Sequence, residues 1–179
     1  MKKRHLSRIA CITAVILVGA AGIVKAADAP DAWVTMKTKV SLMTTEGVST
    51  RDLNVDTVNG VVTLHGKVAT EAEKAKAESI TRGIEGAKAI KNLLQVVPSA
   101  QRAVVERSDD SIKESVEAAF TANRRVNTSG VKVASVNKGV VLLSGKTKSF
   151  EAYLESVEVA DAVRGVRRVS TEVEVVPAS

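Results

Sequence analysis

Cysteine and histidine are scarce in this 179-residue sequence. The only cysteine is Cys11, and of the two histidines only His65 lies beyond the first 26 residues. This inventory excludes zinc sites built from Cys and His clusters, and it excludes Cys–His nucleophilic pairs. Beyond Cys11 there is no cysteine to form an internal disulfide, so the rest of the chain must be stabilised by packing alone.

Aromatic residues are equally rare, at 2% of the sequence, which is too few for a platform on which nucleic-acid bases stack. Most of the net charge of +6 comes from the first 26 residues, which hold five of the 26 basic residues and no acidic one. The rest carries 21 basic against 20 acidic residues, so no nucleic-acid partner is expected. No glycine-rich phosphate-binding run precedes a helix pattern, so no cofactor is expected either. The 45% hydrophobic content excludes a disordered chain.

The first 26 residues have the three parts of a secretory signal peptide. Residues 1–8 are basic, residues 9–24 are apolar, and Val24-Lys25-Ala26 places small residues at positions −3 and −1. A membrane anchor is the alternative, but the apolar run is short of the ~18 to 20 residues that a spanning helix needs. Cys11 precedes the apolar run, so lipid attachment is not expected. The sequence predicts a signal peptide over 1–26, cleaved after Ala26.

The remaining sequence is an internal duplication. The segment 59–67 recurs as 137–146 with one extra residue, Lys138, and Val96-Val97-Pro98 recurs as Val175-Val176-Pro177 at an offset of 79 residues. Upstream of the hairpin the offset is 78 residues, so that Val34 matches Ile112. The duplication predicts two domains, over 31–98 and 109–177, joined by a linker over 99–108 that has no usable period.

Each unit reads as helix, strand, strand, helix, strand. Apolar residues every four positions behind Asp31 and Asp109 predict N-capped helices. Asn59-Gly60 predicts a hairpin between two strands, and Thr70 to Glu73 is a capping box that opens a second helix. A last strand is predicted over 90–97 and 169–176. Glycines at equivalent places predict structural turns in both units: Gly60, Gly66 and Gly86, then Gly139, Gly145 and Gly165.

These motifs resemble the BON domain. The resemblance rests on Asp-x-Trp-Val at 31–34, the Asn-Gly-Val-Val-x-Leu-x-Gly hairpin at 59–66, the helix start at 70–74, and the strand entry with Gly86, Ile90 and Asn92. A signal peptide followed by two such domains resembles the hyperosmotically inducible periplasmic protein Y family. The second copy departs by inserting Lys138 and by having Thr171 in place of Asn92.

The resemblance implies an α+β fold of two tandem BON-like domains. In each domain, two helices would pack on one face of a three-stranded mixed sheet. It also implies a periplasmic location, no enzymatic activity, and contact with phospholipid or envelope proteins during osmotic stress.

A catalytic triad would have to use His65. Alternation along its strand places His65 with Val61 and Thr63 on the face away from the helices, which favours an exposed residue without a catalytic role. Asp and Glu residues do not pair at equivalent positions of the two copies, so nothing indicates a pair of catalytic carboxylates.

Three surfaces are candidates for binding. Trp33, Lys37 and Lys39 begin the first helix, and Trp with Lys at a helix end suits a membrane interface, although Trp33 could equally cap the small core. A cluster of arginines surrounds the Gly165 turn and could meet anionic headgroups, although cations at a helix C-terminus are the simpler explanation. The cluster consists of Arg164, Arg167 and Arg168.

The third candidate is the sheet face away from the helices, where alternation places Leu93 in the first copy and Leu142 in the second. This face is too apolar to be fully solvated. Packing of the two repeats against each other is the simpler explanation, and a surface for lipid or protein clients is the functional one. The sequence therefore predicts a non-enzymatic binding protein for phospholipid or a membrane surface, with a chaperone or scaffold for protein clients as the alternative.

Overall fold

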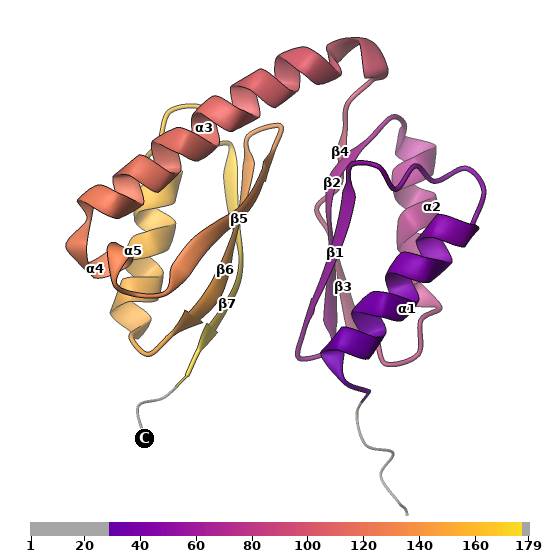
Figure 1. Cartoon of the computed structure of the whole chain (residues 1–179), viewed down its shortest axis with the longest axis horizontal. Helices are drawn as coiled ribbons and strands as arrows, with labels where there is room; N and C mark the ends of the chain where they lie inside the picture. The colour runs from indigo at the N-terminus through magenta and orange to yellow at the C-terminus, as the bar shows by residue number, and fades with distance from the viewer. Residues whose placement is uncertain (1–28, 177–179) are drawn as a thin grey trace, which may run out of the picture.

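The computed structural model describes residues 29–176, so the predicted signal peptide over 1–26 lies outside the described residues. The first domain contains α1 (Asp31–Thr44), β1 (Leu53–Val58), β2 (Val61–Val68), α2 (Glu71–Arg82), β3 (Ala89–Asn92) and β4 (Gln95–Val96). β1 runs antiparallel to β2, whereas β3 and β4 run parallel to β2 and form one interrupted edge. Both helices cover the same face of this mixed sheet (Figure 1).

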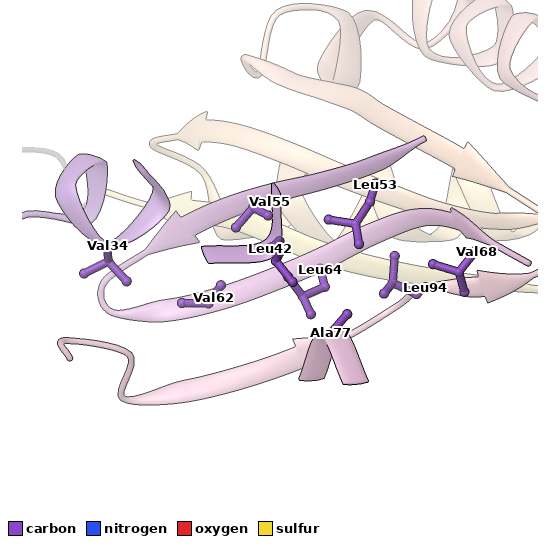
Figure 2. Packing of buried hydrophobic residues seen from close by; sticks show 9 residues of the cluster. All are labelled: Val34, Leu42, Leu53, Val55, Val62, Leu64, Val68, Ala77 and Leu94. Carbon is purple, nitrogen blue, oxygen red and sulfur yellow. The ribbon is translucent and has the colours of Figure 1, made fainter. Parts of the chain in front are cut away.

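The core of the first domain lies between these helices and the sheet. Val34 and Leu42 reach it from α1, Ala77 from α2, and Leu64 from the central strand, and all four are fully buried. Figure 2 shows Leu42, Leu64 and Ala77 close to Leu94, which follows β3, and Val34 at the other end of the same cluster. The four-residue spacing on α1 thus buries one side of that helix, as the sequence predicts.

The second domain repeats this plan with η1 (Ser99–Gln101), α3 (Arg102–Ala122), α4 (Arg124–Asn127), β5 (Val131–Asn137), β6 (Val140–Thr147), α5 (Phe150–Asp161) and β7 (Arg168–Val175). β5 pairs antiparallel with β6, and β6 pairs parallel with β7. The predicted α+β fold class of two tandem BON-like domains is confirmed. The short α4 was not predicted from the sequence; the Asn123 side chain caps it by accepting from the Arg125 and Val126 N–H groups.

Two local predictions, on the segment between the domains and on the last strand of the first domain, need correction. The segment 99–108, interpreted as a linker without a period, is helical, because η1 leads directly into α3. The last strand of the first domain is interrupted after Asn92, whose amide oxygen accepts from the Leu94 N–H while its NH₂ group donates to Glu78. Its counterpart β7 has Thr171 there and is continuous.

Gly66 and Gly145 lie within β2 and β6 and do not end these strands. Each has a positive φ, +120° and +124°, and a Cβ on Gly66 would stand 1.9 Å from the Asp52 carbonyl oxygen. Glycine is needed here because the neighbouring backbone passes too close for any side chain. The other four predicted turn glycines also have positive φ: Gly60, Gly86, Gly139 and Gly165.

The two aspartates that were expected to cap helices hold the hairpins instead. Asp31 is the first residue of α1, and its carboxylate accepts from the backbone N–H groups of Asn59 and Gly60. Asp109 lies inside α3 and accepts in the same way from Lys138 and Gly139. The N-cap prediction is wrong because these carboxylates satisfy the hairpin donors and not those of the helix end.

The two sheets face each other, and the helices lie on the outside of both (Figure 1). The domains are turned end for end, so that the β1–β2 and β5–β6 hairpins lie at opposite ends of the molecule. A buried ion pair between Lys67 and Asp109, at 3.1 Å, joins the domains near one end, and Asn59 donates to Glu174 near the other. The α3 helix starts beside the first domain, where Arg102 pairs with Asp52.

Candidate functional site

Helix α1 is apolar on two sides. The side that carries Val34, Thr38 and Leu42 is buried against the sheet. The opposite side carries four exposed apolar residues, here called the α1 stripe: Trp33, Met36, Val40 and Met43, with exposed fractions of 46%, 49%, 53% and 71%. At 3.6 residues per turn these four positions fall within about 80° of the helix circumference. They therefore form one continuous apolar surface turned to solvent.

Two lysines border the α1 stripe, one on each side. Lys37 lies with its Nζ 5.5 Å from the centre of the Trp33 ring, a cation–π distance, and also pairs with Glu85 at 3.2 Å. Lys39 is exposed on the other border. The structure thus brings together Trp33, Lys37 and Lys39, the first group that the sequence singled out.

Sequence reasoning missed the other members of the stripe. Met36, Val40 and Met43 follow Trp33 at intervals of three and four residues, a helical spacing that was available as a signal. The buried face of α1 gave the stronger signal because its apolar spacing of four residues repeats in both copies. The stripe does not repeat: the equivalent α3 positions are polar or small and exposed, namely Ser111, Glu114, Ala118 and Thr121.

The arginine cluster is exposed and stands apart from the stripe. Arg164, Arg167 and Arg168 are exposed, and none forms an ion pair within residues 29–176. The Arg167 N–H donates to the Gly139 carbonyl, which places this turn beside the β5–β6 hairpin. Since α1 is anchored to the opposite hairpin, the structure does not bring the two cationic candidates together.

Leu93 and Leu142 are buried where the two sheets face each other, with exposed fractions of 9% and 1%. Val97 and Val140 are buried with them. The outward sheet face is therefore covered by the other domain, and neither leucine presents a surface to a further partner.

The interpretation of His65 as an exposed residue is wrong. Its ring does point away from the helices, but it is 5% exposed because the second domain covers it. Nε2 lies 2.8 Å from Asp56 Oδ2, and Nδ1 lies 2.9 Å from Ser135 Oγ of the second domain. The hydrogen bond to His65 is the main cause that lowers the pKa of Asp56. Alternation within one strand could not reveal a partner sheet 70 residues away in the sequence.

A second, smaller apolar patch lies on α5. Phe150 and Leu154 are 57% and 45% exposed, and the Phe150 and Tyr153 rings are 5.8 Å apart. The equivalent first-domain positions are Glu71 and Ala75, so this patch too belongs to one domain alone. The sequence analysis did not identify it.

Within residues 29–176, no helix is both long and apolar enough to cross a membrane, and no group of His, Cys, Asp and Glu is arranged to hold a metal ion. What the site offers is an apolar helix face with flanking cations.

The BON domain family model matches residues 30–98 and 108–177. The chain belongs to the BON-domain family. Osmotically-inducible protein Y of Escherichia coli strain K12 is 30% identical over 145 residues, which are 80% of this chain and 72% of that protein. Outer membrane lipoprotein DolP of Haemophilus influenzae is 30% identical over 117 residues, and the 21 kDa hemolysin of Actinobacillus pleuropneumoniae is 34% identical over 118. Each of these two matches covers 65% of this BON-domain chain and 59% of the relative.

Proposed function

We propose that this BON-domain protein binds the surface of phospholipid membranes through α1, without catalysis. The observation that carries the proposal is the α1 stripe, four apolar side chains exposed together and bordered by Lys37 and Lys39. A helix with an apolar face and flanking lysines lies in the membrane interface, with its apolar side chains below the headgroups. Trp33 suits this depth because its ring is apolar and its N–H can remain hydrated.

The two lysines add attraction to anionic lipid. A lysine near an anionic surface contributes ~1 kcal/mol, and salt weakens that contribution. Apolar insertion is the larger effect, because the chain beyond residue 26 is close to neutral. Binding should therefore be stronger on anionic vesicles and persist in part at high salt.

The relatives support an envelope setting for this function. One is named as osmotically inducible and another as an outer membrane lipoprotein. A cleaved signal peptide over 1–26 would deliver the chain to the periplasm, where it would face membrane phospholipid during osmotic stress. Intact-mass analysis of the periplasmic fraction tests this: the mature protein should begin at Ala27, and a mass that retains residues 1–26 would contradict it.

Vesicle binding tests the main proposal directly, because Trp33 is the only tryptophan and reports on its own environment. The emission of Trp33 should shift to the blue on vesicles of phosphatidylglycerol and phosphatidylcholine, and the protein should float with them. Replacing all four stripe residues with Ser should reduce flotation at least tenfold. A variant with Phe150→Ser and Leu154→Ser is the matched control, since it removes exposed apolar residues from α5 and should float normally.

Charge is tested separately with two variants. Lys37→Ser with Lys39→Ser should weaken binding to anionic vesicles at low salt only. Replacing the three arginines of the Gly165 turn with Ser should change binding little, because they lie at the other end of the molecule. Normal flotation of the stripe variant, with its circular dichroism unchanged, would refute membrane binding through α1.

A further inference from the structure

The interface between the two sheets has an apolar end and a polar end. At the apolar end Leu93 and Leu142 are buried together with Val97 and Val140. An offset of 79 residues matches Leu93 with Glu172 and Thr63 with Leu142. The polar end therefore has Glu172 and Thr63 where the apolar end has two leucines. Because the two domains are copies of one unit, the residues at the two ends of the interface can be compared position by position.

The polar end is hollow. A cleft of about 680 Å³ opens between the domains there. Its first-domain wall contains Val58, Val61, Thr63 and Lys91, and its second-domain wall consists of residues 171–176 and Lys146 of β6. Glu172 and Thr63 line this cleft at the positions equivalent to the two leucines.

Two polar atoms beside this cleft, Thr63 Oγ1 and Glu172 Oε1, have no hydrogen bond of good geometry among the described residues, although the Thr63 hydroxyl lies close enough to the Glu172 carboxylate to lower its pKa. Thr63 is fully buried, and a buried hydroxyl without a partner is costly. Burial also raises the pKa of Glu172, and nearby Asp56 adds to the rise, while Thr63, His65 and Lys91 oppose it. A ligand that carries hydrogen-bond donors and a positive charge would complement the Glu172 carboxylate.

The edge of β7 faces the cleft. Six consecutive residues, 171–176, line it, so side chains from both faces of the strand border the same space. β7 is the last strand of its sheet, and its outer backbone groups have no partner strand. Lys91 Nζ donates to the Thr171 carbonyl and covers one point of this edge. Two of the other outer edges are less regular, since β5 has a bulge near Ala134 and β3 is separated from β4, whereas β1 is regular but does not contribute its whole length to this cleft.

The charges in the cleft leave one carboxylate available. Glu174 is paired with Lys146 at 2.6 Å and also accepts from Asn59. Glu172 has no ion-pair partner within residues 29–176. A row of unpaired backbone groups can pair with another strand, and an unpaired carboxylate can form an ion pair with a basic side chain.

We propose that this cleft binds an extended peptide segment, which pairs with the edge of β7 and places a Lys or Arg side chain against Glu172. Addition of a strand to an exposed sheet edge uses the backbone for affinity and alternate side chains for specificity. The apolar side chains of the peptide would meet Val58 and Val61. This site is separate from the α1 stripe, so it does not depend on membrane binding.

A short labelled peptide tests the proposal. The probe is a fluorescein-labelled nine-residue peptide in which valine alternates with lysine and threonine, and its anisotropy should rise with the intact protein. Two control peptides, one with proline at alternate positions and one with glutamate in place of lysine, should bind at least tenfold more weakly. Amide hydrogen exchange should slow along β7 only with the first peptide.

Filling the cleft gives the decisive variant. Thr63→Leu with Glu172→Leu gives the polar end the leucines of the apolar end, and it should reduce peptide binding at least tenfold while raising Tm. Glu114→Leu, on the exposed face of α3, is the matched control and should bind normally. Should the filled variant fail to fold, Glu172→Gln remains informative, because it should reduce the preference for the lysine peptide over the glutamate peptide.

The proposal is overturned if the lysine peptide does not bind, if the proline peptide binds equally well, or if the folded filled variant retains full affinity. Loss of vesicle flotation by the filled variant, with peptide binding unchanged, would likewise overturn it and would assign the cleft to lipid.

Discussion

The two domains have the same fold but differ in what they present to solvent and to each other. The first carries the α1 stripe, whereas α3 has Ser111, Glu114, Ala118 and Thr121 at the equivalent places. The second domain buries Asp109 in an ion pair with Lys67, whereas its equivalent Asp31 is half-buried and, among residues 29–176, contacts its own hairpin without an ion pair. Positions that serve the shared core match in the two copies, so the positions that differ mark contacts outside it.

Substitution of the two hairpin aspartates, Asp31 and Asp109, should give the largest difference in free energy of unfolding between equivalent variants of the two domains. Asp109→Ala removes two hydrogen bonds and leaves Lys67 buried without its partner, which should lower the free energy of unfolding by about 3–5 kcal/mol. Asp31→Ala removes two similar hydrogen bonds at a partly solvated site and should cost about 1–2 kcal/mol. Urea denaturation of both variants measures the contrast, and equal losses would contradict it.

Grafting the stripe onto the second domain should create a second membrane-binding helix. The variant combines Ser111→Trp, Glu114→Met, Ala118→Val and Thr121→Met, all at exposed positions. Combined with replacement of the α1 stripe by Ser, it should restore vesicle flotation about tenfold, since apolar area is the main driving force. If flotation is not restored in a folded protein, binding needs more of the first domain than its stripe.

Alanine substitution of His65 and of its counterpart Ser144 should give a smaller difference in the free energy of unfolding. His65→Ala removes the bonds to Asp56 and to Ser135 across the interface, and it should lower the free energy of unfolding by about 1–3 kcal/mol. Ser144→Ala should change it by less than about 0.5 kcal/mol. Thermal unfolding of the two variants measures the difference, and a neutral His65→Ala would show that the bond to Ser135 does not help to join the domains.

The smallest effect concerns pH, and two carboxylates should respond in opposite directions. The raised pKa of Glu172 means that its charge opposes folding at pH 7, so Glu172→Gln should stabilise the protein there. This gain should shrink as pH falls through the raised pKa toward the ordinary value of about 4.3. The lowered pKa of Asp56 means that Asp56→Asn should destabilise at pH 7, and that this loss should fade below the ordinary value of about 3.9.

Urea titrations at pH 7 and about pH 4 test the sign for Glu172→Gln, and a third series below about pH 3 tests the fading of the Asp56→Asn loss. A gain for Glu172→Gln that is as large at pH 4 as at pH 7 would show that desolvation of its charge is not the cause.

The sequence was sufficient for the family and for the order of the main helices and strands in each domain, because short-range signals carry both. The period of four on α1, the Asn59-Gly60 turn and the match between copies all lie within a few residues of each other or at a fixed offset. The alternation in β2 correctly separated Leu64 from His65, on opposite faces of the sheet.

What the sequence could not supply were consequences of one domain packing on the other. His65 is buried, Asp109 is paired and Leu142 is covered only because the second sheet lies against the first. The helical structure of residues 102–108, at the start of α3, could not be predicted either, because this stretch has no apolar period of its own. Its register is set by the rest of the helix.

The helical connection through η1 and α3 determines how the protein meets a protease. Proteases cleave extended segments that fit their active-site clefts, and exposed flexible loops are the usual sites. The chain between β4 and the core of the second domain offers no such segment, because it enters a helix at Ser99 that continues to Ala122. The protein should therefore survive limited proteolysis as one piece and not be cut into two separate halves.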